Sequence, residues 1–85
     1  MEAHVVDEAL ALAESAATVR DAARVLREHY SLLRVVVVDA FDMRDETPAA
    51  AGARRALYYG ATDGHCWQVT SDPGQAAGFF VADRG

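Results

Sequence analysis

The residues with the greatest chemical capability lie in two short segments of the chain. His65 and Cys66 are adjacent in the second half, and Asp39 and Asp42 closely follow a run of four valines. An imidazole, a thiolate and two carboxylates together make a ligand set for a divalent cation. These four residues are therefore the candidates for a metal or ligand site in an accessory protein, provided that the fold brings the two segments together.

The same residues argue against catalysis. Neighbouring residues on a strand point to opposite faces, so His65 and Cys66 make a poor nucleophile pair. One thiol cannot form a disulfide within the chain or a zinc site of four thiolates, and the acids match no calcium-binding loop. The glycines form neither a G-x-G-x-x-G nor a Walker pattern, and no serine lies in a nucleophile elbow. The sequence predicts a protein that is not an enzyme and holds no cofactor.

Charge and composition exclude several classes of function. The 85 residues allow one domain, which we expect over residues 1–85, and 13 acids against 8 basic residues give a net charge of -5. No basic cluster is larger than Arg54–Arg55, so nucleic-acid binding is not expected. No apolar run approaches the ~20 residues of a membrane span, and the acidic N-terminus does not resemble a signal peptide. We expect a cytoplasmic protein that does not bind membranes.

Two amphipathic segments begin the chain. Apolar residues recur at helical spacing over residues 4–16 and again over residues 19–30. Thr18 followed by Asp21 is a capping-box pattern, which favours a new helix start directly after Thr18. One continuous helix over residues 5–30 is the alternative, and the sequence leaves it open.

The residue types after these segments favour strands. The β-branched run at 32–38 predicts a central strand with both faces covered. Residues 55–61 and 66–70 predict an antiparallel hairpin closed by Asp63-Gly64. A helical turn and a last strand are expected at 72–78 and 79–82. The predicted fold is an α+β domain with two N-terminal helices packed on one face of a three- to four-stranded, mostly antiparallel sheet.

Aromatic residues are concentrated in the predicted sheet. Two adjacent pairs must divide between its two faces: Tyr58, Tyr59, Phe79 and Phe80. Trp67 and Val69 share one face of their strand, and because they are its larger apolar pair we expect them to point toward the helices. Two Ala-rich helices cover only one face, which leaves aromatic surface for a protein interface. We therefore expect a small interaction module, either a homodimer or a subunit that docks on a larger protein, with contacts from one alternate set of these four aromatic residues.

The chain also resembles a known group of proteins. The similarity lies in the two Ala-rich helical segments, in Asp39 to Met43, in Leu57-Tyr58, in Asp63-Gly64-His65-Cys66, and in Thr70, Asp72 and Ala77-Gly78. In these features the chain is similar to small bacterial proteins of unknown function that are encoded among nitrogen-fixation genes. The resemblance implies an accessory role near nitrogenase or the assembly of its metalloclusters. It implies no assigned reaction and no catalytic residue.

Overall fold

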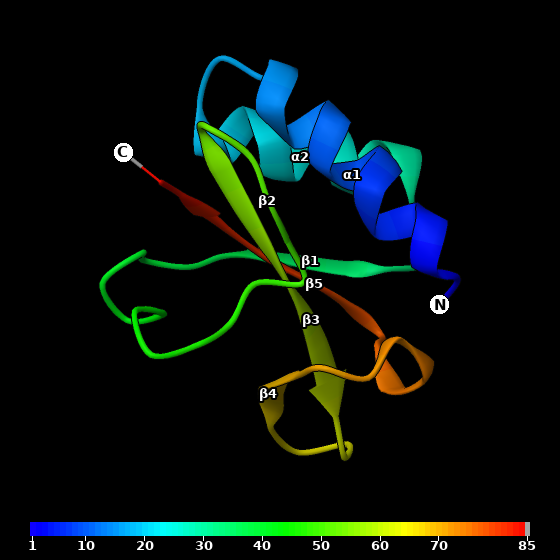
Figure 1. Cartoon of the computed structure of the whole chain (residues 1–85). Coiled ribbons are helices and arrows are strands. Elements are labelled where there is room, and N and C mark those ends of the chain that lie inside the picture. The colour runs from blue at the N-terminus through cyan, green and yellow to red at the C-terminus, as the bar shows by residue number, and fades with distance from the viewer. Residues whose placement is uncertain (85) are drawn as a thin grey trace.

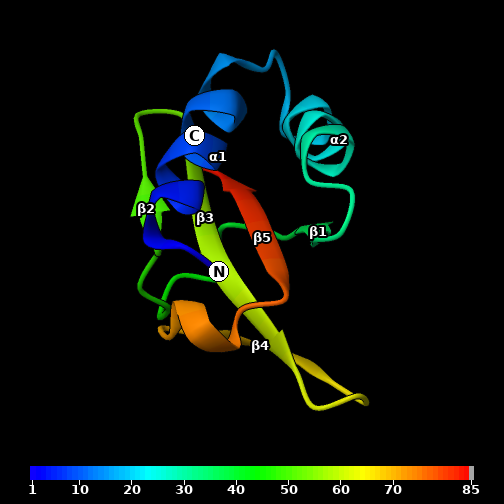
Figure 2. The same cartoon turned by 90° about the vertical axis from the view of Figure 1, so that its right-hand side faces the viewer.

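The computed structural model describes residues 1–84 as two layers, with two helices over one face of a five-stranded sheet (Figure 1, Figure 2). The elements in chain order are α1 (Ala3–Ser15), α2 (Val19–His29), β1 (Arg34–Val37), β2 (Ala50–Ala51), β3 (Arg55–Thr62), β4 (Trp67–Thr70), a short 3-10 helix (Pro73–Gln75) and β5 (Gly78–Asp83). This is the α+β class that the sequence predicts, with one strand more than expected.

The sheet is mixed but mostly antiparallel. β1 pairs with β5 in parallel, whereas β3 pairs antiparallel with β5, β2 and β4. Leu57 of β3 is opposite residues of both β2 and β5, and Tyr59 is opposite residues of both β4 and β5. β2 and β4 therefore share the edge of β3 that β5 leaves free. β1 forms the opposite edge of the sheet.

Two separate helices precede the sheet. α1 ends at Ser15, and the backbone of Ala16 is extended, with φ -75° and ψ 148°. The Thr18 hydroxyl then accepts a hydrogen bond from the Asp21 N–H at 3.0 Å and caps the start of α2. The structure therefore has two helices, as the capping pattern favours, and not one continuous helix over residues 5–30.

The main core lies between the helices and one face of the sheet. The helices contribute mainly alanines to it: Ala9, Ala13, Ala22 and Ala23. These small side chains leave room for larger groups from the strands, which are Val35, Leu57, Tyr59, Phe79 and Val81. The rings of Tyr59 and Phe79 stack with their centroids 6.2 Å apart. The sheet therefore supplies most of the side-chain volume of this core.

The valine run forms an edge strand, so the prediction of a central strand is wrong. β1 covers only Arg34–Val37 and pairs with β5 alone. Of its four residues only Val35 is buried, and Val37 is 37% exposed. A high strand propensity favours a strand but does not specify how many strands pair with it. Val35 is buried under the helices, and Val38 contributes to a smaller cluster on the other face.

Trp67 and Val69 lie on the face away from the helices, so their predicted inward orientation is also wrong. Tyr59 faces the helices, and its neighbour Gly60 therefore faces the other way. Val69 is opposite Gly60 in the ladder, and Trp67 is two residues earlier on the same face. Size favours burial, but it does not select a face when the helix-free face has a small core of its own around Met43.

Candidate functional site

The four residues predicted to form a metal or ligand site lie at opposite ends of the sheet. Asp39 and Asp42 follow β1, whose end lies beside the later residues of β5, and β5 runs antiparallel to β3. The aspartates are thus near the start of β3, whereas His65 and Cys66 follow its end. Within residues 1–84, no three His, Cys, Asp or Glu side chains form a group that could hold a metal ion. The fold does not bring the two segments together.

His65 and Cys66 lie in the exposed turn between β3 and β4. The Asp63 carboxylate accepts hydrogen bonds from the backbone N–H groups of His65 and Cys66, at 2.9 and 3.0 Å. These bonds lower the pKa of Asp63, with the Cys66 N–H contributing most. Gly64 has a φ of 98°, a conformation that glycine adopts without strain. Asp63 and Gly64 therefore serve to close the hairpin.

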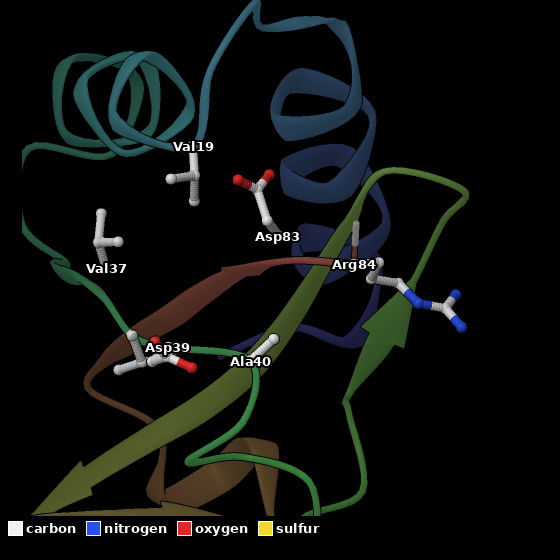
Figure 3. Close-up of a pocket in the computed structure, with 7 residues that line it drawn as sticks. Val19, Val37, Asp39, Ala40, Asp83 and Arg84 are labelled. Carbon is white, nitrogen blue, oxygen red and sulfur yellow. The ribbon is translucent and has the colours of Figure 1, made fainter.

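Asp39 lines an open depression of about 580 Å³ beyond the end of β1 (Figure 3). The other lining residues come from the start of α2 and the ends of β1 and β5: Val19, Val37, Val38, Ala40, Asp83 and Arg84. Asp39 Oδ1 accepts a hydrogen bond from the Phe41 N–H at 2.7 Å. Asp83 forms an ion pair with Arg55 at 3.0 Å. Both carboxylates therefore already have partners within the chain.

Three of the four aromatic residues predicted at an interface are buried within the chain. Tyr59 and Phe79 lie under the helices. Tyr58 is buried on the other face, where Phe80 lies opposite it in the ladder and stays partly exposed. Tyr59 and Phe79 form the set that faces the helices, and Tyr58 and Phe80 form the set on the other face. Among these four residues only Phe80 keeps part of its surface exposed.

An apolar patch remains uncovered on this face. We call it the helix-free patch and define it by Val36, Val69, Trp67 and Phe80. Trp67 is 37% exposed, and the other three are partly exposed. Ring atoms of Phe80 and Trp67 each lie 3.3 Å from the position that a Cβ of Gly60 would occupy, so the two rings meet over this glycine. The register places Val36 beside Phe80, which makes the patch continuous from β1 to β4.

The other end of the same face is covered by the segment between β1 and β2. Met43 from this segment is buried against a small cluster on the sheet: Ala56, Tyr58 and Ala82. Phe41 in the same segment is 68% exposed, and the Arg44 guanidinium lies 4.1 Å from the centre of its ring. Val69 and Phe80 of the helix-free patch pack against this cluster and still remain partly exposed.

A cluster of hydrogen bonds joins α1 to the turn between β2 and β3. Glu14 Oε2 accepts from the backbone N–H groups of Arg55 and Arg54, at 2.6 and 3.0 Å. The two guanidinium groups in return donate to carbonyl oxygens at the end of α1, which are those of Glu14, Ala16 and Ala17. Gly52 leaves space for the carboxylate, since a Cβ there would lie 2.6 Å from Glu14 Oε2. The paired arginines therefore have a structural role.

Replacing Glu14 by glutamine is expected to destabilise the protein at neutral pH and to have less effect in acid. Partial desolvation raises the pKa of Glu14, but the N–H groups of Arg55, Arg54 and Ala53 outweigh it, and the net pKa lies below the ordinary value of 4.5. A carboxylate with a lowered pKa stabilises the folded state above its unfolded pKa, and this contribution is lost as the pH falls through the folded pKa.

Thermal unfolding between about pH 7 and pH 3 checks this expectation. The melting temperatures of wild type and Glu14→Gln should converge in acid, and a gap that is independent of pH would contradict the account. Glu46→Gln is the control, because Glu46 is exposed and makes no side-chain hydrogen bond within residues 1–84. It should follow the wild type at every pH.

No helix among the described residues combines the length and the apolar character that crossing a membrane requires. The resemblance to proteins encoded among nitrogen-fixation genes stays a prediction. The chain matches no protein family, no curated protein and no solved structure.

Proposed function

We propose that this protein is a small interaction module that self-associates through the helix-free patch, with two copies meeting face to face. The patch itself supports the proposal, because Trp67 is 37% exposed and meets the partly exposed Phe80 over Gly60. Aromatic residues on an uncovered surface are typical anchors of protein interfaces. Covering them with a second copy removes apolar surface from water, which favours association.

The size of the molecule sets the expected strength of the dimer. A specific interface usually covers about 800 Å² per partner, and the isolated chain exposes 5139 Å² in total. An interface of that size must extend beyond the patch to polar residues on the same face, such as Arg34 and Thr62. A small apolar centre with a polar rim favours a dimer that forms at micromolar concentration.

Sedimentation equilibrium of wild-type protein and of Trp67→Glu tests the proposal. We expect the wild type to be dimeric at micromolar concentration. A glutamate buried within the interface would lack a partner, so we expect Trp67→Glu to raise the dimer dissociation constant at least about 100-fold. Far-UV circular dichroism establishes whether the variant monomer is folded.

Phe41→Glu is the matched control, since it places the same charge at an aromatic residue that is 68% exposed and lies outside the patch. We expect it to dimerise like the wild type. A wild type that stays monomeric at high micromolar concentration would overturn the proposal. A dimer that survives Trp67→Glu would do the same.

The alternative function, a metal- or ligand-binding accessory protein, has less support. Its candidate residues, Asp39, Asp42, His65 and Cys66, lie in two segments at opposite ends of the sheet. Docking on a larger protein and a role in nitrogen fixation stay predictions from the sequence. The exposed thiol of Cys66 suits a reducing compartment, and we propose the cytoplasm as the location.

A further inference from the structure

The free edge of β1 presents backbone groups that the sheet does not use. In a parallel pair, alternate residues of a strand direct their backbone groups to the partner strand. The N–H groups of Arg34 and Val38 donate to carbonyl oxygens in and just before β5, so these two residues face β5. Val35 and Val37 therefore direct their N–H and C=O groups outward, at the edge of the sheet beneath α2 (Figure 2).

One of these outward groups is occupied by a side chain of α2. The Arg27 guanidinium donates two hydrogen bonds to the Val35 carbonyl, from Nη2 at 2.9 Å and from Nε at 3.1 Å. Within residues 1–84, the outward N–H and C=O of Val37 have no hydrogen-bond partner. Charged side chains at an edge protect it from unselective strand pairing. Arg27 therefore occupies the backbone carbonyl at the Val35 end of the edge, whereas the backbone groups at the Val37 end remain available for pairing.

A hollow with a basic rim lies beside the open end. It measures about 390 Å³, is lined by Arg20, Arg27 and Val37, and shares Val37 with the larger depression of Figure 3. Arg20 and Arg27 form no ion pair with the described residues, whereas Arg24 on the same helix contacts two acids. Two unneutralised cations on a chain of net charge -5 favour a negatively charged partner at this place.

We infer that the free edge of β1 binds an extended acidic segment of a partner protein, which adds to the sheet as a further strand. The arriving strand donates an N–H to the Val35 carbonyl and pairs with the N–H and C=O of Val37. The N–H of the added strand displaces the Arg27 guanidinium from the Val35 carbonyl. The guanidinium then pairs with a carboxylate of the segment, which replaces the two hydrogen bonds it loses. Alternate side chains of the added strand face α2, and acidic residues at these positions would meet Arg20 and Arg27. The remaining side chains lie on the other face beside Val36, where apolar residues would extend the apolar surface of the sheet.

A second copy of this chain does not suit the same edge. Two β1 strands paired edge to edge would bring Arg20 and Arg27 of one copy toward the same arginines of the other, and like charges oppose that approach. The β1 edge adjoins the helix-free patch at Val36, but it offers backbone groups and two arginines, whereas the proposed dimer depends on Trp67 and Phe80. The inference therefore goes beyond the proposed dimer, and the variants at Val37 and Trp67 test the two separately.

Fluorescence anisotropy with a labelled peptide of sequence Glu-Val-Glu-Val-Glu tests the inference. We expect wild-type protein to bind it, and added salt to weaken the complex. Val37→Pro removes an outward N–H and keeps the pairing with β5, because an edge strand tolerates proline where its N–H faces solvent. We expect Val37→Pro to weaken binding at least about tenfold, and Arg20→Glu by a similar factor.

Arg44→Glu is the control, because it makes the same charge change at an exposed residue that does not line the hollow and that follows Met43 in the segment over the helix-free face. It should bind the peptide like the wild type. A peptide N-methylated throughout its backbone cannot pair as a strand in any register, so it gives a readout even if Val37→Pro fails to fold. The inference is overturned if wild type does not bind the peptide, if N-methylation leaves binding unchanged, or if Arg44→Glu and Arg20→Glu weaken binding equally.

Discussion

Protein carrying Gly78→Ala is expected to lose a large part of its stability, because the new methyl group has no space. Gly78 is the first residue of β5 and lies opposite Arg34 of β1. A Cβ on Gly78 would overlap the Arg34 carbonyl oxygen and lie 2.8 Å from its carbonyl carbon. These are backbone atoms, so the clash is relieved only if the two strands separate. We expect a loss of about 3 kcal/mol and a melting temperature lower by roughly 12–24 °C.

Thermal unfolding followed by circular dichroism measures this loss. Gly74→Ala is the matched control, because a Cβ on Gly74 would meet only the exposed Asp72 side chain, at 3.1 Å from Oδ1. Its stability should stay within about 1 kcal/mol of the wild type. If Gly78→Ala melted together with the wild type, β1 would not be held against β5 in the register described above.

The second large effect is expected from Arg55→Ala. Arg55 is only 3% exposed, and it donates from Nη2 to the Ala16 carbonyl at 3.0 Å while Nη1 contacts Asp83 at 3.0 Å. Removing the side chain leaves both oxygens without this partner and opens a cavity next to the end of α1. We expect a loss of about 3 kcal/mol in the free energy of unfolding.

Urea denaturation of two further variants separates the causes of this loss. Arg54→Ala removes the exposed neighbour, whose guanidinium also donates to carbonyl oxygens of α1, and should cost less than about 1 kcal/mol. Arg55→Met keeps the apolar stem without the charge. The Nε of Arg55 is buried without a partner among the described residues, so we expect methionine to restore part of the stability. Equal losses for Arg54→Ala and Arg55→Ala would contradict the structural difference between the two arginines.

Local signals in the sequence predict the elements of this fold better than their arrangement. The Thr18–Asp21 cap and the Asp63-Gly64 turn act within a few residues, and the structure has the helix start and the hairpin where these patterns indicate. The edge position of β1 depends instead on its parallel pairing with β5, a segment far along the chain that no local pattern specifies. The two alanines of β2 carry no strand signal and are ordered by pairing with β3.

The same distinction explains the candidate sites. The parallel pairing of β1 with β5 places Asp39 at the end of the sheet away from His65, and spacing along the chain does not reveal this. Alternation gives the relative orientation of Trp67 and its neighbours, but not which face meets the helices. Gly60 is the residue whose type indicates where Trp67 packs. A glycine within a strand marks a place where neighbouring groups approach closely, and here the rings of Trp67 and Phe80 do so.

The emission of Trp67 tests most directly whether the protein self-associates through the helix-free patch. It is the only tryptophan of the chain, and it lies in the patch at 37% exposure. On dilution from about 100 µM to about 0.1 µM, the emission should shift to longer wavelength as water reaches the ring, with a midpoint at the dissociation constant found by sedimentation. Emission that stays constant over this range would contradict the account, whether the protein is then a monomer or a dimer joined elsewhere.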